Sequence, residues 1–339
     1  MAEHIVVFTE REGGPVCGLD EELIRKNGGA VRYGRAADEK ERIQIAAGAD
    51  VIVLGGARLP REFFTALPDL RGVVRLGIGV DNIDLEAATE LGIVVGNIPD
   101  FCSDEVAEHA IGLAVAVTRK IVLADRKSRC GEWVPGMDAQ LRPMRRLSGQ
   151  TIGLIGLGKI GRCTAAKAKG LGMKVIAYDP YANTEAAKAA GITLMRLEEL
   201  LPQTDILSLH VPETAETRNI INARTLALLK PGAILVNVAR GAVVDETALA
   251  AALASGQLAG AGLDVLQQEP IRLPHPLTQF ENVVFTCHYA SLSEESYVIM
   301  RQQASEQSVQ ILRGEYPQNL VNVQVKDAPQ CRLRRESGK

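Results

Sequence analysis

TIGLIGLGKIG, residues 151 to 161, joins an apolar run to the glycine pattern G-x-G-x-x-G. In this pattern Gly156 permits a tight turn, Gly158 lets backbone N–H groups approach a phosphate, and Gly161 lets the following helix pack on its strand. The N-terminus of that helix adds about half a positive charge. The order strand, glycine loop, helix predicts a dinucleotide-binding unit, although the glycines alone would also fit a structural turn.

The next apolar run, residues 174 to 178, ends at an acidic residue, Asp179. Asp179 lies 18 residues after Gly161, close to the roughly 20 at which a carboxylate accepts hydrogen bonds from the adenosine ribose. The alternative is a turn aspartate before Pro180. A carboxylate here repels a ribose 2′-phosphate, and residues 180 to 183 contain no arginine, so NAD is predicted rather than NADP.

Short β-branched and apolar runs alternate with helical patterns on both sides of this motif. Such alternation predicts parallel sheets covered by helices on both faces. The predicted fold class is therefore α/β, with two doubly wound parallel-sheet domains. The runs span residues 5–8, 49–54, 73–76 and 93–95 in a first series, and 152–155, 174–178, 205–209, 233–238, 262–265 and 283–285 in a second.

Two long helices are expected from apolar residues at helical spacing. Residues 103–129 are predicted to form one long, largely buried connecting helix, with Ser103 as its N-cap. Residues 294–312 are predicted to form the other, which Gly314 would end.

The end of the chain, residues 327–339, has no periodicity and is predicted to be disordered. Its basic residues could bind an anionic partner, but a solvated terminus is the preferred interpretation. They are Arg332, Arg334 and Arg335.

Composition excludes several classes of protein. The 339 residues carry 38 Lys and Arg against 41 Asp and Glu, a net charge of −3, so neither nucleic acid nor an anionic membrane is an expected partner. Six cysteines form no C-x-x-C pair and no Cys/His cluster, so reduced thiols and no metal site are expected. The start MAEH is unlike a signal peptide, and no apolar run approaches the roughly 20 residues of a membrane span. A cytoplasmic protein is therefore expected.

Three polar residues, Arg240, Glu269 and His288, follow different apolar runs of the second series. Each alone would more often be structural, but open α/β sheets hold their ligands at the carboxyl ends of strands. Together they suit hydride transfer to a 2-keto acid. Arginine binds a carboxylate through two donors, histidine donates a proton near neutral pH, and glutamate keeps the imidazole charged and oriented. Of the other histidines, His109 and His210 are expected to be structural, while His4 lies at the chain start and His275 in a proline-rich loop.

Residues 75 to 84 read RLGIGVDNID, similar to a segment R-x-G-x-G-x-D-N-I-D of a known family. The order Arg240, Glu269, His288 also matches that family's catalytic positions. From about residue 49 to residue 323, the chain resembles the D-isomer-specific 2-hydroxyacid dehydrogenases. The resemblance implies an NAD-dependent oxidoreductase that interconverts a small D-2-hydroxy acid and a 2-keto acid.

The resemblance also implies a layout and a set of contacts. A flavodoxin-like substrate domain, residues 1–102 and 293–326, would contain an inserted Rossmann NAD domain, residues 103–292. A homodimer would form through the NAD domain at residues 129–133, although Trp133 could equally be a core or lid residue. The implied cofactor contacts are Val106, Gly156, Gly158, Lys159, Ile160, Gly161, Asp179, Val211, Pro212, Thr217, Val238, Ala239, Arg240, Asp264 and His288. The implied substrate contacts are Gly77, Ile78, Gly79, Arg240 and His288.

Two positions depart from the family's pattern. Cys287 stands where the family typically carries proline before the catalytic histidine, and an inert thiol is favoured because hydride transfer needs no nucleophile. Phosphoglycerate members place a phosphate-binding arginine where this chain reads Gly55-Gly56-Ala57. Arg58 could replace it, but a phosphorylated substrate is disfavoured.

Residues 100–106 and 288–296 are most similar to the branch that includes the C-terminal-binding-protein corepressors. A second hypothesis is therefore an NAD(H)-sensing protein that recruits peptides and has residual dehydrogenase activity. The chain has no long low-complexity flanks, which favours the enzyme.

Overall fold

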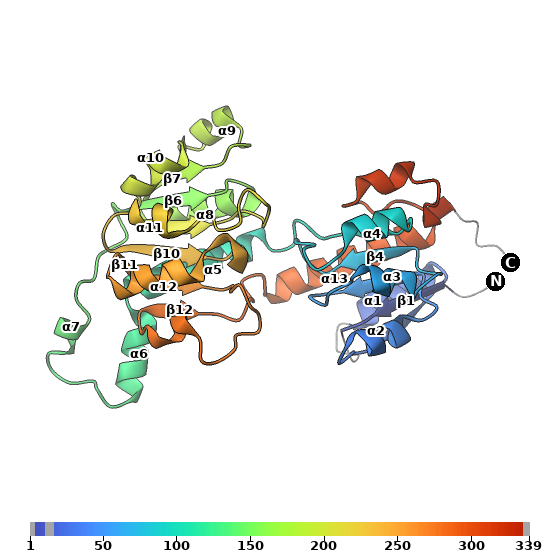
Figure 1. Cartoon of the computed structure of the whole chain (residues 1–339), viewed down its shortest axis with the longest axis horizontal. Coiled ribbons are helices and arrows are strands. Elements are labelled where there is room, and N and C mark those ends of the chain that lie inside the picture. The colour runs from blue at the N-terminus through green and yellow to red at the C-terminus, as the bar shows by residue number, and fades with distance from the viewer. Residues whose placement is uncertain (1–3, 11–16, 335–339) are drawn as a thin grey trace. The chain divides into compact units, whose positions relative to one another are not determined.

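The computed structural model describes residues 4–10 and 17–334, which are coloured in Figure 1. The chain divides into two compact units. The first unit comprises Met1–Phe101 and Ser293–Lys339, so both ends of the chain contribute to it. The inserted unit comprises Cys102–Leu292. Each unit has its own parallel sheet and its own hydrophobic core.

The first unit holds a five-stranded parallel sheet in the order β2-β1-β3-β4-β5. The strand order reverses between β1 and β3, as in flavodoxin-like doubly wound sheets. The strands are β1 (His4–Phe8), β2 (Gly29–Tyr33), β3 (Val51–Leu54), β4 (Gly72–Arg75) and β5 (Val94–Gly96). The helices are α1 (Cys17–Lys26), α2 (Glu39–Ala46), α3 (Arg61–Thr65), α4 (Leu85–Glu90) and α13 (Glu294–Leu312), with 3₁₀ turns η4 (Val323–Asp327) and η5 (Arg332–Arg334).

The inserted unit holds a seven-stranded parallel sheet in the order β12-β11-β10-β9-β6-β7-β8. The order reverses between β6 and β9, which is the Rossmann arrangement with one additional strand, β12. The strands are β6 (Thr151–Ile155), β7 (Lys174–Tyr178), β8 (Thr193–Leu194), β9 (Ile206–Leu209), β10 (Ala233–Asn237), β11 (Leu258–Leu263) and β12 (Val283–Phe285). The helices are α5 (Ser103–Thr118), α6 (Ile121–Arg129), α7 (Met137–Gln140), α8 (Lys159–Gly170), α9 (Thr184–Ala189), α10 (Leu197–Leu200), α11 (Ala223–Ala227) and α12 (Glu246–Ala254), with η1 (Leu201–Gln203), η2 (Gly241–Val243) and η3 (Pro276–Gln279).

The central strands are buried on both faces. All four residues of β3, VIVL, are buried, which is what a continuous apolar run predicts for a sheet covered on two sides. Helix α13 packs on α1, β3 and β4, so the C-terminal segment completes the core of the first unit. In β11, Gly260 leaves room for α5, because a Cβ atom there would lie 2.7 Å from Val117 Cγ1.

The predicted α/β fold with two parallel sheets is confirmed, and so is helix 294–312, which ends before Gly314 at φ +77°. Two strands were missed by the sequence analysis. β2 has only one fully buried residue, Gly29, and β8 is two residues long. Both lie at sheet edges, where one side of the strand has no neighbour and a continuous apolar run is not required. Among the described residues, no helix combines the length and the apolar character needed to cross a bilayer.

The prediction of one helix over residues 103–129 is wrong, because the segment forms α5 and α6 with a break at Lys120. Lys120 has φ 49°, and its N–H bonds to the carbonyl of Val117 rather than continuing the α-helical ladder. The prediction that this segment is largely buried holds for α5 but is wrong for α6, which has no buried residue and whose Ile121 is 51% exposed. Ser103 is not the N-cap either: Cys102 occupies that position, and the Ser103 hydroxyl has no partner among the described residues.

The prediction of a disordered segment from residue 327 is wrong as far as Arg334, and residues 335–339 lie outside the described residues. Arg332 is only 7% exposed. Its guanidinium Nη1 donates to the carbonyls of Leu67 and Leu70, at 2.9 and 2.7 Å, and its Nε donates to Leu91 at 2.9 Å. These carbonyls lie after α3 and α4, where helix ends leave acceptors unpaired. Arg332 is therefore buried, and its hydrogen bonds hold η5 against the segments that follow α3 and α4.

Candidate active site

The glycine loop between β6 and α8 has the steric properties that G-x-G-x-x-G predicts. Gly156 has φ +95°, and a Cβ atom there would lie 2.5 Å from the carbonyl oxygen of His210. A Cβ on Gly161 would lie 2.3 Å from the carbonyl oxygen of Gly156. A Cβ on Gly158 would meet nothing within 4 Å. The first and third glycines are thus required by packing, while the second faces open space at the start of α8.

Asp179 follows β7 and holds the glycine loop through its carboxylate. Oδ2 accepts from the Leu157 N–H at 2.8 Å, and Oδ1 accepts from the Tyr181 N–H at 2.8 Å. Asp179 also lines a cavity of ≈ 510 Å³ at the carboxyl ends of β6, β7 and β9. Six residues predicted from the sequence to bind the cofactor line this cavity: Gly156, Gly158, Asp179, Val211, Pro212 and Thr217.

Eight further lining residues were not singled out by the sequence analysis as cofactor contacts: Tyr178, Pro180, Tyr181, His210, Thr214, Ala215, Glu216 and Ile220. The Tyr181 hydroxyl donates to Glu216 at 3.1 Å, and this hydrogen bond raises the pKa of Tyr181. Burial lowers the pKa of His210 to about 3, so its ring is neutral at physiological pH. For Tyr181 and His210, the available signal was their place just after β7 and β9.

The chemistry of the cavity fits a dinucleotide. The open face at Gly158 leaves room for a pyrophosphate beside the N-terminus of α8, which favours anions. Asp179 and Glu216 line the cavity together, so a ribose 2′-phosphate would meet two carboxylates. His210 Nδ1 is buried and has no partner among the described residues, which leaves a polar atom for a ligand to satisfy.

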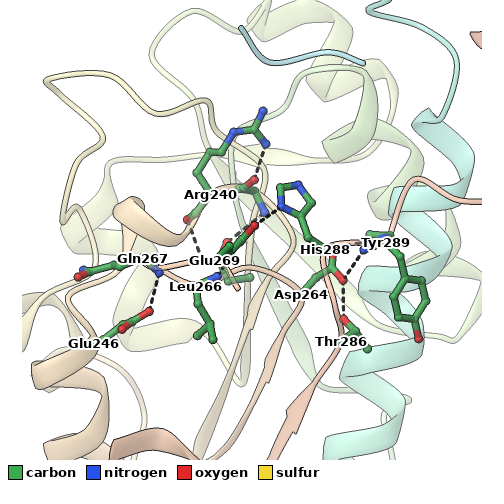
Figure 2. A network of polar contacts seen from close by, with 12 residues as sticks. Arg240, Glu246, Asp264, Leu266, Gln267, Glu269, Thr286, His288 and Tyr289 are labelled. Carbon is green, nitrogen blue, oxygen red and sulfur yellow. Dashed lines mark hydrogen bonds and ion pairs between the residues drawn. The ribbon is translucent and has the colours of Figure 1, made fainter. Parts of the chain in front are cut away.

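His288 and Glu269 form an ion pair at the carboxyl ends of β12 and β11 (Figure 2). His288 Nδ1 lies 2.6 Å from Glu269 Oε2, and Glu269 Oε1 accepts from the Leu266 N–H at 3.0 Å. Burial raises the pKa of Glu269, but the hydrogen bonds from His288 and Leu266 and the charges of His288 and Arg240 together lower it. Glu269 therefore stays ionised beside the ring of His288.

Asp264 anchors the loop that carries His288. Its buried carboxylate accepts from the Thr286 hydroxyl at 2.5 Å and from the N–H groups of Tyr289 and Ala290 at 3.2 and 3.1 Å. The His288 N–H also donates to the Asp264 carbonyl at 2.8 Å. The carboxylate of Asp264, predicted to contact the cofactor, thus binds the loop that carries His288 in this structure. The sequence analysis did not single out Thr286, whose signal was its place just beyond β12.

Backbone geometry aims the His288 side chain. His288 has φ 53°, the left-handed region that side chains seldom adopt, and such strain is found mainly where surrounding bonds enforce it. Cys287, in place of the family's proline, is exposed. Figure 2 shows the imidazole of His288 and the guanidinium of Arg240 both pointing away from the strands.

Arg240 follows β10 and is positioned by Asn237. Asn237 Nδ2 donates to the Arg240 carbonyl at 2.9 Å, and Asn237 Oδ1 accepts from the Ala239 N–H at 3.0 Å. Arg240 Nη1 donates to the Ala239 carbonyl at 2.7 Å. Arg240, Glu269 and His288, which are far apart in sequence, thus follow three neighbouring strands of one sheet.

The other predicted site residues lie outside this cluster. Val106 is buried in α5, Val238 and Ala239 are buried after β10, and Lys159 and Ile160 begin α8. The predicted substrate residues Gly77, Ile78 and Gly79 belong to the first unit, in the loop after β4. Within the described residues, no group of three or more His, Cys, Asp or Glu side chains is arranged to hold a metal ion.

Residues 111–290 match the family model described as D-isomer specific 2-hydroxyacid dehydrogenase, NAD binding domain. The chain belongs to this family. It is 42% identical to the glyoxylate reductase of Korarchaeum cryptofilum over 78% of this chain and 80% of that protein. It is 40% identical to the D-3-phosphoglycerate dehydrogenase of Methanocaldococcus jannaschii. That match covers 87% of this chain but only 56% of the longer relative. The D-lactate dehydrogenase of Aquifex aeolicus, solved with NAD and lactic acid, superposes with a TM-score of 0.82 at 28% identity, covering 94% of this chain and 99% of that one.

Family membership identifies the enzyme class: the protein is an NAD-dependent D-2-hydroxyacid dehydrogenase with NAD as its cofactor. The relatives are a glyoxylate reductase, a D-3-phosphoglycerate dehydrogenase and a D-lactate dehydrogenase. They lend no support to the expected closeness to the corepressor branch or to a corepressor-like role.

Proposed function

We propose that the dehydrogenase interconverts a small, unphosphorylated 2-keto acid and its D-2-hydroxy acid, with Arg240, Glu269 and His288 as its catalytic residues. The observation that carries the proposal is the 2.6 Å contact between His288 Nδ1 and Glu269 Oε2. A carboxylate this close holds the ring at Nδ1 and fixes its orientation. The other ring nitrogen, Nε2, is then the one that faces the substrate.

Each residue has a distinct task in the proposed reaction. NAD, when bound, accepts or supplies the hydride. His288 donates a proton to the carbonyl oxygen during reduction and removes it from the hydroxyl during oxidation. Glu269 stabilises the imidazolium, and Arg240 binds the substrate carboxylate through its forked donors.

The first unit is proposed to supply the remaining carboxylate contacts. Asn97 Nδ2 donates to the Ile78 carbonyl at 2.6 Å, and the Ile98 N–H donates to the Gly77 carbonyl at 3.0 Å. Among the described residues, none accepts a hydrogen bond from the N–H groups of Ile78 and Gly79. These amide groups suit a substrate carboxylate. The first unit is therefore proposed as the substrate domain, and the inserted unit as the NAD domain.

The choice of a small substrate follows from this chain and from its relatives. The glyoxylate reductase relative matches over most of its own length. The loop after β3 reads Gly55-Gly56-Ala57, where phosphoglycerate members of the family place a phosphate-binding arginine. Glyoxylate and hydroxypyruvate are the proposed substrates. NADH consumption with glyoxylate, hydroxypyruvate, pyruvate, phenylpyruvate and 3-phosphohydroxypyruvate tests this choice, and activity on none of them would overturn the proposed function.

A cytoplasmic homodimer, formed through the inserted unit, is also proposed. Trp133 is 84% exposed, so its interpretation as a core residue is wrong. Val134, the next residue, is 50% exposed as well, and adjacent exposed apolar residues favour an interface. The free thiols of the described cysteines agree with a reducing compartment.

The catalytic role of His288 is tested with a matched pair of histidines. His288→Gln should lower turnover by about 100- to 10,000-fold while NADH binding is preserved, because the variant lacks the proton donor. His275 is also paired with a glutamate, Nε2 lying 3.3 Å from Glu246 Oε2, but it lies in the loop before η3. His275→Gln should retain turnover. Equal turnover in wild type and His288→Gln would remove His288 from proton transfer.

A further inference from the structure

Glu10 makes an unusual set of contacts in the first unit. Its carboxylate accepts hydrogen bonds from three consecutive backbone N–H groups in the loop after β3. Oε2 accepts from Gly55 at 2.8 Å and from Gly56 at 3.1 Å, and Oε1 accepts from Ala57 at 2.6 Å. Three successive amides that converge on one acceptor form a concave anion-binding site, or nest.

The carbonyl side of this loop is held by a different residue. Asn82 Nδ2 donates to the Ala57 carbonyl at 2.6 Å and to the Gly55 carbonyl at 3.2 Å. The loop is therefore fixed with its carbonyls toward Asn82 and its amides toward Glu10. A Cβ atom on Gly55 would lie 2.4 Å from Glu10 Oε2, so glycine is what lets the carboxylate approach the nest.

The nest lies where this kind of sheet holds ligands. Glu10 follows β1, and the Gly55–Ala57 loop follows β3, the two strands between which the strand order reverses. In doubly wound sheets, ligands bind at this reversal, beyond the carboxyl ends of the strands. The loop after β4, which contains Gly77, is adjacent: the Leu76 N–H donates to the Leu54 carbonyl at 2.7 Å. An anion-binding nest at this edge is thus filled by the protein's own carboxylate.

We propose that Glu10 is a specificity-determining residue that occupies this nest and disfavours 2-keto acids carrying a second anionic group. A substrate phosphate or distal carboxylate would have to displace Glu10 or lie against its charge, and like charges in contact oppose binding. Acids with a short, uncharged side chain do not meet this repulsion. The inference rests on the proposed function for its substrates, while the nest and its occupant belong to the first unit alone.

The kinetic test compares Glu10→Ala, which opens the nest, with Glu10→Gln, which keeps the shape and removes the charge. Glu41→Ala is the control, because Glu41 also accepts from a backbone N–H, that of Ala37 at 2.7 Å, but lies on α2. We expect both Glu10 variants to raise kcat/KM for 3-phosphohydroxypyruvate and oxaloacetate relative to hydroxypyruvate, by about 10-fold or more in Glu10→Ala. Glu41→Ala should leave the ratio at the wild-type value. Ratios within about twofold of wild type in both Glu10 variants would overturn the proposal.

A binding measurement separates this inference from the proposed function. Inorganic phosphate should raise the unfolding temperature of Glu10→Ala more than that of wild type or Glu41→Ala, because only the open nest can bind it. Phosphate that binds elsewhere would shift all of these proteins alike, and that result would count against the nest. If wild type reduces none of the acids, the proposed function fails, and the phosphate measurement alone decides the role of Glu10.

Discussion

The carboxylate of Asp179 has a structural role in the glycine loop, and we propose that it also binds the cofactor. Its oxygens accept from Leu157 in the glycine loop and from Tyr181 in the loop after β7. An ionised carboxylate has about four lone-pair sites, so these two bonds leave capacity for ribose hydroxyls. We therefore propose that the residue that orders the glycine loop also binds the ribose.

Replacing Asp179 by Ala should reduce the preference for NADH over NADPH. The expected fall in the ratio of their kcat/KM values is about 10-fold or more, since the charge that repels a 2′-phosphate is lost. Steady-state kinetics with both cofactors measures it. Glu185→Ala, at the exposed start of α9, is the control and should keep the wild-type preference. An unaltered preference in Asp179→Ala would show that another group reads the ribose.

His210 makes stability depend on pH. Burial lowers its pKa to about 3 in the folded protein, against about 6.5 in the unfolded chain. Below about pH 6.5, the His210 ring is protonated in the unfolded chain but not in the folded protein. The free energy of unfolding therefore falls by about 1.4 kcal/mol for each unit by which the pH decreases. Above about pH 6.5, neither state binds this proton, and the full contribution of His210 to the free energy of unfolding is present.

His210→Gln should therefore flatten the acid side of the stability curve. Between about pH 7.5 and pH 5, the wild-type protein should lose about 2 kcal/mol more unfolding free energy than the variant. Urea unfolding followed by circular dichroism at the two pH values measures the difference. Parallel losses in the two proteins would mean that His210 is protonated in the folded state.

At the scale of the element, α8 offers two glycines with opposite surroundings. Gly161 lies in the first turn against the Gly156 carbonyl, whereas a Cβ on Gly170, at the end of the helix, would meet nothing within 4 Å. The same chemical change therefore has opposite consequences at the two ends of one helix.

Gly161→Ala should destabilise the protein by about 1–3 kcal/mol and weaken NADH binding, because the new methyl group displaces the backbone of the glycine loop. Gly170→Ala should be neutral or stabilising by up to about 1 kcal/mol, since alanine suits a helix better than glycine. Thermal unfolding and NADH fluorescence titration measure both effects. Wild-type stability and affinity in Gly161→Ala would contradict the close packing of α8 on its strand.

At the scale of the whole molecule, the proposed dimer depends on the exposed apolar region around Trp133. Light scattering after size exclusion should give about twice the chain mass of 36.4 kDa, as a two-fold interface requires. Trp133→Glu should shift the protein toward monomer, because a charge at the centre of an interface is poorly tolerated. Leu273→Glu, at another exposed apolar residue of the same unit, should leave the mass unchanged. A monomeric wild type would refute the dimer.

Much of the architecture could be predicted from residue order because its causes are local. The central strands are continuous apolar runs, and the glycine loop needs three glycines within six residues. Even the grouping of Arg240, Glu269 and His288 was predictable, since parallel strands bring their carboxyl ends to one edge of a sheet. The strands β2 and β8 were not, because β2 is only partly buried and β8 has only two residues, so neither has a continuous apolar run.

Sequence alone determined the α/β class, the dinucleotide loop and the trio of polar residues, whose requirements are met within a few positions or by one rule of sheet geometry. Only the tertiary structure decided which distant polar groups satisfy one another. Arg332 donates hydrogen bonds to carbonyl groups near residue 67, and Glu10 accepts hydrogen bonds from the amide nest at residue 55. Hydrogen bonds of this kind join groups by proximity in space, and no periodicity along the chain records that proximity.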